Sequence, residues 1–525
     1  MRASELFRGL GTVSSLTAAS RVLGLIRDAG MAVLFGAGPL MDAFTVAFRL
    51  PNLARRLFGE GSLTAAFLPV FVREYAADEQ RGREVAWATT VLLAIVLAVL
   101  TIAVELLLVL GLWLVDGPSN ELLRLCVVLT PYVIWICVAA QLSAVLHALR
   151  RFFWPAVLPL ILNVCWIAAI LIGPRLTDDP SLQMLLIAGT VTLTGVVQVG
   201  VLLAVLRRLK FRWAWEPSGS RAATREIAAA VVPTMIGLSI TQLNTVADSL
   251  LAWALSPSAG VSERFVFVEA GAATALYLGQ RVHQVPLGVF GIALSTVLFP
   301  VFAEHAQQRR FAELGRDLTR GLQIVLIIGV PSSLGLILLG REIPTLLFEY
   351  GAFTARDSEL TTRMLAGYGL GVWAFMALPI LNRGFFAIGD RLTPMRIGLA
   401  VIVVHLVLNA AGAWLLGGAG LAVATSIAAS VQVVWVVVLI HRRVAPLLAG
   451  PIVRTTGKVA ASTIAMAVAC RGSQLLLDNV GSTRVLDVLV PVAAAVVTYA
   501  AAAWGLGLQS ILASTKVSKR EKPPH

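Results

Sequence analysis

The feature that most constrains this chain is a succession of long apolar runs separated by short charged breaks. A bilayer core about 30 Å thick needs roughly 20 apolar residues for each spanning helix, and the runs reach that length. They are too long for the strands of a membrane barrel and lack an alternating pattern, so they predict helices. The sequence therefore predicts an all-α polytopic membrane protein.

We expect about fourteen spanning helices. Their predicted ranges are 13–35, 41–71, 86–114, 121–148, 153–173, 183–206, 226–255, 267–302, 318–340, 359–387, 395–416, 419–441, 455–476 and 485–512. Only 14% of the residues are charged and 58% are hydrophobic, whereas a soluble domain carries about 25% charged residues. This composition excludes a soluble enzyme and a disordered chain.

The formal net charge of +13 is unevenly distributed among the predicted loops. Of the 42 lysines and arginines, 21 lie in six alternate loops and eight lie in the loops between them. This asymmetry is typical of the positive-inside bias, and it predicts that both termini and the basic loops face the cytoplasm. We interpret the basic loops as topology signals that contact anionic lipid headgroups, and we expect no nucleic-acid partner.

Seven arginines fall within the predicted spans rather than in loops. They are Arg21, Arg27, Arg49, Arg55, Arg56, Arg281 and Arg383. Each costs about 2.5–3.5 kcal/mol at the centre of a spanning helix, so it is expected either near a helix end, where it reaches the interface, or in a hydrated cavity. A position near the interface is as compatible with Arg56 and Arg383 as a position in a cavity.

Acidic residues near these arginines are fewer, namely Asp28, Asp42 and Glu60. A purely structural interpretation pairs Arg27 or Arg21 with Asp28, and Arg56 with Glu60, and it still leaves positive charge over. The planar guanidinium group is suited to phosphate. We therefore favour a cavity for an anionic ligand over structural pairing, and we expect Pro51 to kink or split the second helix.

Two segments far apart in the chain resemble each other and indicate an internal repeat. FLPVFVREYA (67–76) is similar to LFPVFAEHA (298–306), with Pro69 and Pro300 aligned. Similarity through apolar composition alone is the alternative explanation. The repeat predicts two pseudo-symmetric six-helix lobes with two further helices and a basic tail, at residues 1–215, 216–445, 446–512 and 513–525.

Four motifs stand out in the sequence. They are SRVLGLIRD (20–28), FGAGPLMDAFTVAFRLPNLARRLFGEGSLTAAFLPVF (35–71), LFEYGAFT (347–354) and GFFAIGDRLTP (384–394). Together they resemble the MurJ (MviN) family of lipid II flippases, within the multidrug/oligosaccharidyl-lipid/polysaccharide exporter superfamily.

The resemblance implies fourteen helices in the bacterial inner membrane, a cationic cavity between two lobes, and a groove for the polyprenyl tail at the last two helices. It implies transport of the undecaprenyl-pyrophosphate-linked peptidoglycan precursor (lipid II) from the cytoplasmic to the periplasmic leaflet. We expect membrane lipids and the cell-wall synthesis machinery as further partners.

The same motifs imply the substrate-binding residues and no catalytic ones. These are Ser20, Arg21, Arg27, Asp28, Asp42, Asn52, Arg55 and Arg281. Arg281 matches the arginine of a second-lobe motif whose preceding acidic residue is replaced here by Gln280. That departure leaves Arg281 without the neighbour that the family usually supplies.

A second set of polar residues suggests coupling to a cation. Asp248 lies in the seventh predicted span, His405 and Asn409 are one turn apart in the eleventh, and Thr425 lies in the twelfth. The spacing of His405, Asn409 and Thr425 resembles a sodium site of some relatives. However, hard cations prefer oxygen ligands, and His405 supplies nitrogen. A proton-coupled Asp248–His405 pair and a structural polar cluster are the alternatives. We expect no cofactor or tightly held metal, and coupling to the membrane potential, Na⁺ or H⁺ stays open.

Other functions fit the residues less well. A flippase for another polyprenyl-linked oligosaccharide follows the same logic, whereas a cation-coupled drug exporter would need acidic rather than arginine-rich cavity residues. A membrane-embedded transferase would need clustered carboxylates for a metal and a sizeable loop outside the membrane. The sequence contains no Walker motif for ATP. We therefore expect a transporter and not an enzyme.

Overall fold

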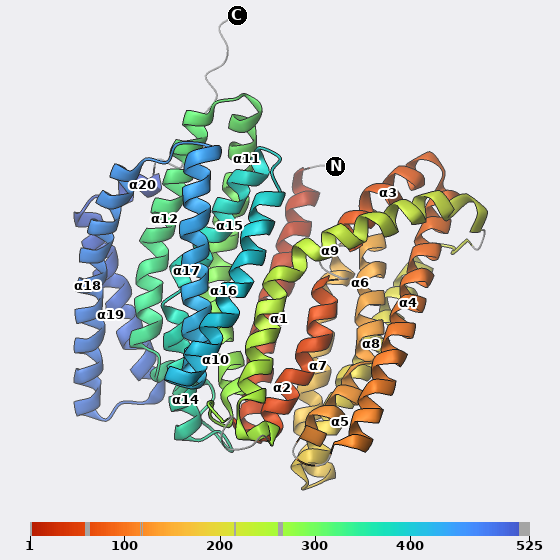
Figure 1. Cartoon of the computed structure of the whole chain (residues 1–525), viewed down its shortest axis with the longest axis horizontal. Coiled ribbons are helices and arrows are strands. Elements are labelled where there is room, and N and C mark those ends of the chain that lie inside the picture. Colours follow the sequence, from red (N-terminus) through yellow and green to blue (C-terminus); the bar gives the residue numbers. More distant parts are fainter. Residues whose placement is uncertain are drawn as a thin grey trace, which may run out of the picture. The chain divides into compact units, whose positions relative to one another are not determined.

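The computed structural model describes residues 3–57, 63–115, 117, 119–214, 217–260 and 266–513, and within these ranges its regular structure is entirely helical. The chain separates into two compact units (Figure 1). Unit 1 comprises Met1–Val266 and Tyr350–Phe353, and unit 2 comprises Phe267–Glu349 and Thr354–His525.

Unit 1 is a bundle of long helices. Its elements are α1 (Ala3–Phe35), α2 (Pro39–Ala54), α3 (Leu63–Ala77), α4 (Glu79–Leu114), α5 (Ser119–Leu129), α6 (Tyr132–Ala148), α7 (Phe153–Leu176), α8 (Pro180–Arg208), α9 (Pro217–Ala254) and the short 3₁₀ turn η2 (Pro257–Ala259). Two of these helices, α4 and α8, begin at an aspartate that satisfies one of their first N–H groups. Asp78 accepts a hydrogen bond from Gln80 N at 2.9 Å before α4, and Asp179 accepts one from Ser181 N at 3.0 Å before α8.

Unit 2 contains the remaining helices. Its elements are α10 (Ala272–Pro286), the π-helical turn η4 (Leu287–Gly291), α11 (Ile292–Gln307), α12 (Phe311–Leu338), α13 (Glu342–Leu347), α14 (Ala355–Gly369), α15 (Val372–Ala387), α16 (Leu392–Leu416), α17 (Gly418–Arg443), α18 (Ala449–Val480), α19 (Arg484–Gly505) and α20 (Gln509–Ala513). The π-helical turn η4 between α10 and α11 follows Pro286, which has no N–H group to donate to the hydrogen-bond ladder of an α-helix.

Most of the predicted spans are found. Within the described residues, ten helices are long and apolar enough to cross a membrane, and the bent pair α14–α15 makes up to eleven. The prediction of an all-α polytopic membrane protein is confirmed. The other three expected spans, 13–35, 41–71 and 226–255, coincide with α1, with α2 and α3, and with α9, which fall outside that set. The count of fourteen therefore stays a prediction.

The second expected span is two helices rather than one. α2 contains Pro51 and ends at Ala54, and α3 begins at Leu63. α2 continues through Pro51, and residues 55–57 are π-helical. Residues 58–62, which include Glu60, lie outside the described residues, so the predicted kink or split stays a prediction.

Each unit has its own apolar core, while other apolar side chains point outwards. Phe67, Phe71 and Leu142 are buried in unit 1, and Phe302 and Phe385 are buried in unit 2. The outer face of α4 exposes a long row of large apolar residues. A helix facing acyl chains has this pattern, because lipid tails are as apolar as the side chains themselves.

Two of the sequence motifs form turns in which a glycine adopts a positive φ angle. In GFFAIGDRLTP, Gly389 adopts a positive φ of 81° and Asp390 caps α16 by accepting hydrogen bonds from Leu392 N and Thr393 N. Hydrogen bonding to Thr393 lowers the pKa of the Asp390 carboxyl below its ordinary value. In LFEYGAFT, Gly351 has φ 59° and packs on the backbone of Val33.

The predicted lobe boundaries stay a prediction. The helix α9, which begins near the expected boundary at residue 215, packs against α2, α3 and α4 in unit 1. The last two long helices, α18 and α19, pack on each other, and α18 also packs on α12. There Gln474 Nε2 donates hydrogen bonds to Leu338 O at 3.0 Å and to Glu342 Oε1 at 2.8 Å.

The contact between α16 and α17 depends on glycine. A Cβ on Gly412 would lie 2.5 Å from the carbonyl oxygen of Gly420, whereas a Cβ on Gly457 in α18 would meet nothing within 4 Å. We expect Gly412→Ala to lower the free energy of unfolding by about 1–3 kcal/mol through overpacking. Gly457→Ala is the matched control and should be neutral or slightly stabilising. Thermal unfolding of both variants in detergent checks this, and equal midpoints would contradict it.

Candidate functional site

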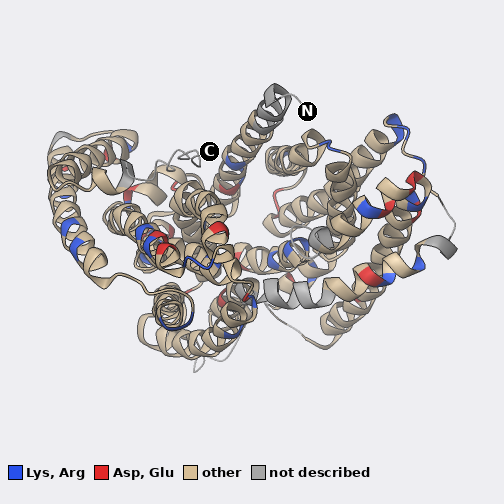
Figure 2. Ribbon diagram, turned by 90° about the horizontal axis from the view of Figure 1, so that it is seen from above, with Lys and Arg blue, Asp and Glu red and all other residues tan. Residues whose placement is uncertain are grey.

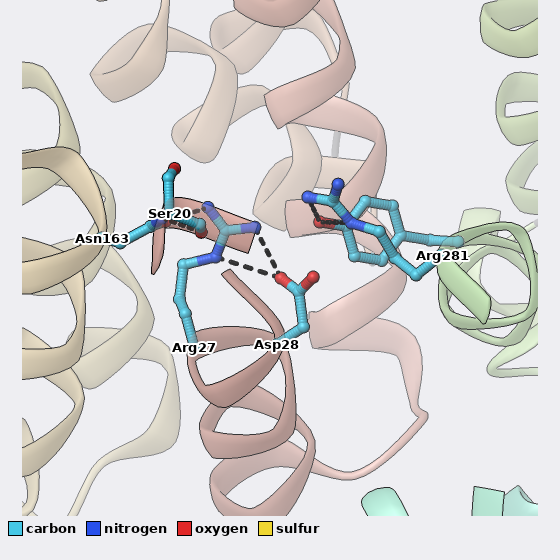
Figure 3. A network of polar contacts seen from close by, with 6 residues as sticks. Ser20, Arg27, Asp28, Asn163 and Arg281 are labelled. Carbon is cyan, nitrogen blue, oxygen red and sulfur yellow. Dashed lines mark hydrogen bonds and ion pairs between the residues drawn. The ribbon is translucent and has the colours of Figure 1, made fainter. Parts of the chain in front are cut away.

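Arg27 on α1 is the centre of a buried polar cluster in unit 1 (Figure 3). Its Nε and Nη2 atoms donate to Asp28 Oδ1 at 3.0 and 2.6 Å, and its Nη1 atom donates to Asn163 Oδ1 on α7 at 3.0 Å. Asn163 Nδ2 in turn donates to Ser20 O at 3.0 Å. The guanidinium also lies over the ring of Trp166, 4.4 Å from its centroid.

This arrangement explains how two charges are held inside the bundle. Arg27 and Asp28 are each only 4% exposed. A buried ion pair is stable only when its remaining donors and acceptors are satisfied, and Asn163 satisfies one side of Arg27. The predicted pairing of Arg27 with Asp28 is present. Protein groups thus contact all three nitrogen atoms of Arg27 and fix the orientation of its guanidinium plane.

The end of α2 carries two more oriented arginines. Arg55 donates from Nε and Nη2 to Asn52 Oδ1, at 3.3 and 3.0 Å. Arg56 Nη1 donates to Gln242 Oε1 of α9 at 2.8 Å. Both acceptors are neutral amides, which orient a guanidinium without cancelling its charge. Both arginines are half-buried.

The other predicted residues of unit 1 lie in different environments. Arg21 is exposed and Arg49 is half-buried. Asp42 is completely buried, and Ser258 Oγ of η2 donates a hydrogen bond to its Oδ2 atom at 3.2 Å. In this conformation Asp42 therefore joins α2 to η2 and presents no surface to a ligand.

In unit 2, Arg281 is held by Tyr277 one turn earlier on α10 (Figure 3). Its Nε and Nη2 atoms donate to the tyrosine hydroxyl at 3.1 and 2.8 Å, and its guanidinium lies 5.1 Å from the ring centroid. The hydroxyl of Tyr277 thus orients the guanidinium of Arg281. Nearby, buried His283 packs between the rings of Tyr368 and Phe375.

The predicted cation-coupling residues divide between the units. Asp248 is buried in α9 of unit 1. In unit 2, His405 Nε2 and Thr425 Oγ1 are 3.2 Å apart and join α16 to α17, with Asn409 buried one turn along. Among the residues that the structure describes, no group of three or more His, Cys, Asp or Glu side chains is suited to a metal ion.

Sequence reasoning missed the partners that orient the arginines. Asn163, Trp166 and Tyr277 were not expected to take part. Asn163 is the one strongly polar side chain in the expected span 153–173, and that isolation was a usable signal. Tyr277 lies four residues before Arg281, the spacing of neighbours on one helix face.

Arginines held inside the bundles of a helical membrane protein fit a transporter of anionic molecules, and comparison with known proteins identifies the family. The profile of the family described as "Lipid II flippase MurJ" matches residues 31–489. The chain belongs to this family, and it is accordingly a multi-pass membrane transporter rather than an enzyme. The family resemblance seen in the motifs is confirmed.

Curated relatives carry the same description. A "Probable lipid II flippase MurJ" of Vibrio cholerae is 33% identical over 79% of this chain and 79% of its own length. A "Lipid II flippase MurJ" of Burkholderia cenocepacia is 31% identical over 81% of this chain and 82% of its own. A probable flippase of Rhizobium meliloti is 29% identical over 98% of this chain and 97% of its own.

Solved structures show the fold. A "Lipid II flippase MurJ, inward closed conformation" superposes with a TM-score of 0.75 at 21% identity, over 95% of this chain and 99% of that chain. An inward-facing multidrug resistance MATE transporter of the MOP superfamily gives 0.60 at 16% identity, over 80% and 95%. The fold is thus that of the exporter superfamily expected from the motifs.

The buried ion pair yields a prediction about stability. Arg27→Ala leaves the Asp28 carboxylate buried without its ion-pair partner, and we expect a loss of about 3–5 kcal/mol. Removing both groups in Arg27→Ala/Asp28→Ala should restore part of that loss, because no uncompensated charge is left. The exposed Arg21→Ala on the same helix is the control. Thermal unfolding in detergent checks the series, and a double variant less stable than Arg27→Ala would contradict it.

Proposed function

We propose that this chain moves lipid II across the bacterial inner membrane, from the cytoplasmic to the periplasmic leaflet, with both of its termini in the cytoplasm. The observation that carries the proposal is that arginines within the helical bundles are half-buried and oriented by polar side chains. Arg55 is oriented by Asn52, Arg56 by Gln242 and Arg281 by Tyr277. Membership of the flippase family supports the identity of the cargo.

The chemistry of the cargo explains why arginine is needed. A pyrophosphate cannot cross hydrocarbon by itself, because burying an unpaired charge costs many kcal/mol. Guanidinium groups replace the lost water with charge-assisted, often bidentate hydrogen bonds to phosphate oxygens. We propose that Arg27, Arg55 and Arg281 receive the pyrophosphate, and that the polyprenyl tail stays in the bilayer.

Asp28 has a separate role in this proposal. Its carboxylate bonds two nitrogen atoms of Arg27 and offsets part of the positive charge. A phosphate that displaces this carboxylate exchanges one anion for another, so binding is favourable without becoming irreversible. Ser20 and Asn163 then keep the side chain of Arg27 in place during the exchange.

Release on the opposite side requires alternating access. We propose that the two halves rock against each other around the site, as repeated halves do in other transporters. Two interruptions supply bending points on the helices that carry the arginines. One is the π-helical stretch 55–57 at the end of α2, and the other is the π-helical turn η4 after Pro286.

The charge of Arg281 is expected to be essential. Arg281→Gln should lower the transport rate by roughly ten- to a hundredfold, because a charge-assisted bond to phosphate is lost. The measurement is rescue of bacteria depleted of their own lipid II flippase, with membrane levels of each variant determined.

Two controls sharpen this test. Tyr277→Phe removes the hydroxyl that orients Arg281 but keeps the charge, so it should retain partial rescue. Arg356→Gln removes an exposed arginine at the start of α14 and should rescue fully. Full rescue by Arg281→Gln at normal protein levels would contradict the proposal.

We expect the driving force to be independent of sodium. The contact of His405 Nε2 with Thr425 Oγ1 occupies the hydroxyl that a sodium ion would need, and a ring nitrogen is a poor ligand for a hard cation. Replacing sodium by choline in proteoliposomes should leave transport unchanged, whereas dissipating the membrane potential should slow it. A rate that follows sodium concentration at constant potential would refute this expectation.

A further inference from the structure

A pocket on unit 1, which none of the arginines described above lines, lies between residues 88–92 of α4 and the first turns of α9. Its volume is about 300 Å³. The side of the pocket formed by α9 carries Arg221 and Arg225, which are one turn apart on the same helix face and are both exposed. Within the described part of the chain, neither arginine has a hydrogen-bond or ion-pair partner. The pocket therefore presents two positive charges to whatever occupies it.

Two hydroxyl-bearing residues also line the pocket. Ser220 is 1% exposed and lines the pocket, as does Thr224. The Oγ1 atom of Thr224 is buried, and it has no hydrogen-bond partner in the ranges that the structure describes. Two cations beside two hydroxyls, near the positive end of the helix dipole of α9, suit the oxygens of a phosphate group.

The neighbouring acidic residue does not compete for these arginines. Glu226 follows Arg225 directly, but its carboxylate bonds Arg73 of α3 at 2.7 and 3.2 Å. The hydrogen bond from Arg73 lowers the pKa of Glu226, so this carboxylate stays ionised and engaged. In Figure 2, blue and red segments lie together at the right-hand end, where Figure 1 places α3, α4 and the beginning of α9.

The remaining wall of the pocket is apolar and continues along the helix. Ala88, Leu92 and Ala228 form it. From Leu92 the exposed apolar surface of α4 extends through Ile95 and Val99, at the three- and four-residue spacing of one helix face. A freely soluble phosphate makes no contact with this apolar face of α4, whereas the acyl chains of a lipid pack along it.

We propose that this pocket binds the headgroup of an anionic phospholipid. Arg221 and Arg225 hold the phosphate, Thr224 donates its hydroxyl hydrogen to a phosphate oxygen, and the acyl chains lie along the exposed face of α4. The lipid comes from the leaflet facing the basic loops, where headgroups attract such arginines. This site is independent of the proposed path of lipid II.

The test measures lipid retention. Full-length protein in detergent is titrated with phosphatidylglycerol and, separately, with phosphatidylcholine, and bound lipids are counted by native mass spectrometry. The double variant Arg221→Gln/Arg225→Gln should retain one phosphatidylglycerol molecule fewer than the unaltered protein. Its affinity for phosphatidylglycerol at that site should fall roughly ten- to thirtyfold, as expected for the loss of two arginines that contact an anionic headgroup.

Matched variants separate charge from shape. Arg442→Gln/Arg443→Gln removes two exposed arginines at the end of α17 and should leave the lipid count unchanged. Ala228→Trp keeps both pocket arginines but fills the space, so it should displace the same lipid. Unfolding midpoints equal to that of the unaltered protein establish that these variants are folded.

Three outcomes would overturn the proposal. Equal retention of phosphatidylcholine would remove the requirement for an anion. Displacement of the lipid by millimolar inorganic phosphate would indicate a site for a soluble anion. An unchanged lipid count in both the arginine double variant and Ala228→Trp would show that the lipid binds elsewhere.

Discussion

The structure depends on how positive charge is kept inside a membrane-spanning bundle. A guanidinium group at membrane depth is costly unless its donors are engaged. Arg27 meets this condition with a carboxylate, an amide and an indole ring, and Arg281 meets it with a tyrosine. These two contacts differ in charge. The carboxylate of Asp28 offsets the positive charge of Arg27, whereas the hydroxyl of Tyr277 orients Arg281 and carries no charge.

This difference has consequences for transport. A fully compensated pair contributes to the packing of α1 against α7, whereas an arginine oriented by a neutral group keeps its attraction for an anion. A transporter needs both properties, since its bundles must stay folded while its cargo binds and leaves. The same distinction separates Arg221 and Arg225, which face a pocket, from Arg73, which is engaged by Glu226. An acidic partner thus weakens the attraction of an arginine for an anionic ligand without abolishing it, as we propose for Arg27.

The candidate site was predictable in part. The motif SRVLGLIRD pointed to Arg27 and Asp28, which pair as expected, and Arg281 was found despite the altered neighbour Gln280. Asp42 was assigned to the same site but is buried against Ser258 instead. A motif identifies a residue, but it does not show toward which side of the helix that residue's side chain points. In helices that are apolar on all sides, hydrophobic periodicity gives little information about that direction.

The sequence by itself determined the class of this protein, because hydrocarbon admits only long apolar helices and every charge placed among them is conspicuous. It also placed most of the long helices and singled out the arginines from which we propose that the site is built. Only the tertiary structure decided the partners, since Asn163 and Trp166 reach Arg27 from a helix more than 130 residues away in the chain. Such contacts arise from the packing of one helix against another, and local sequence carries no record of that packing.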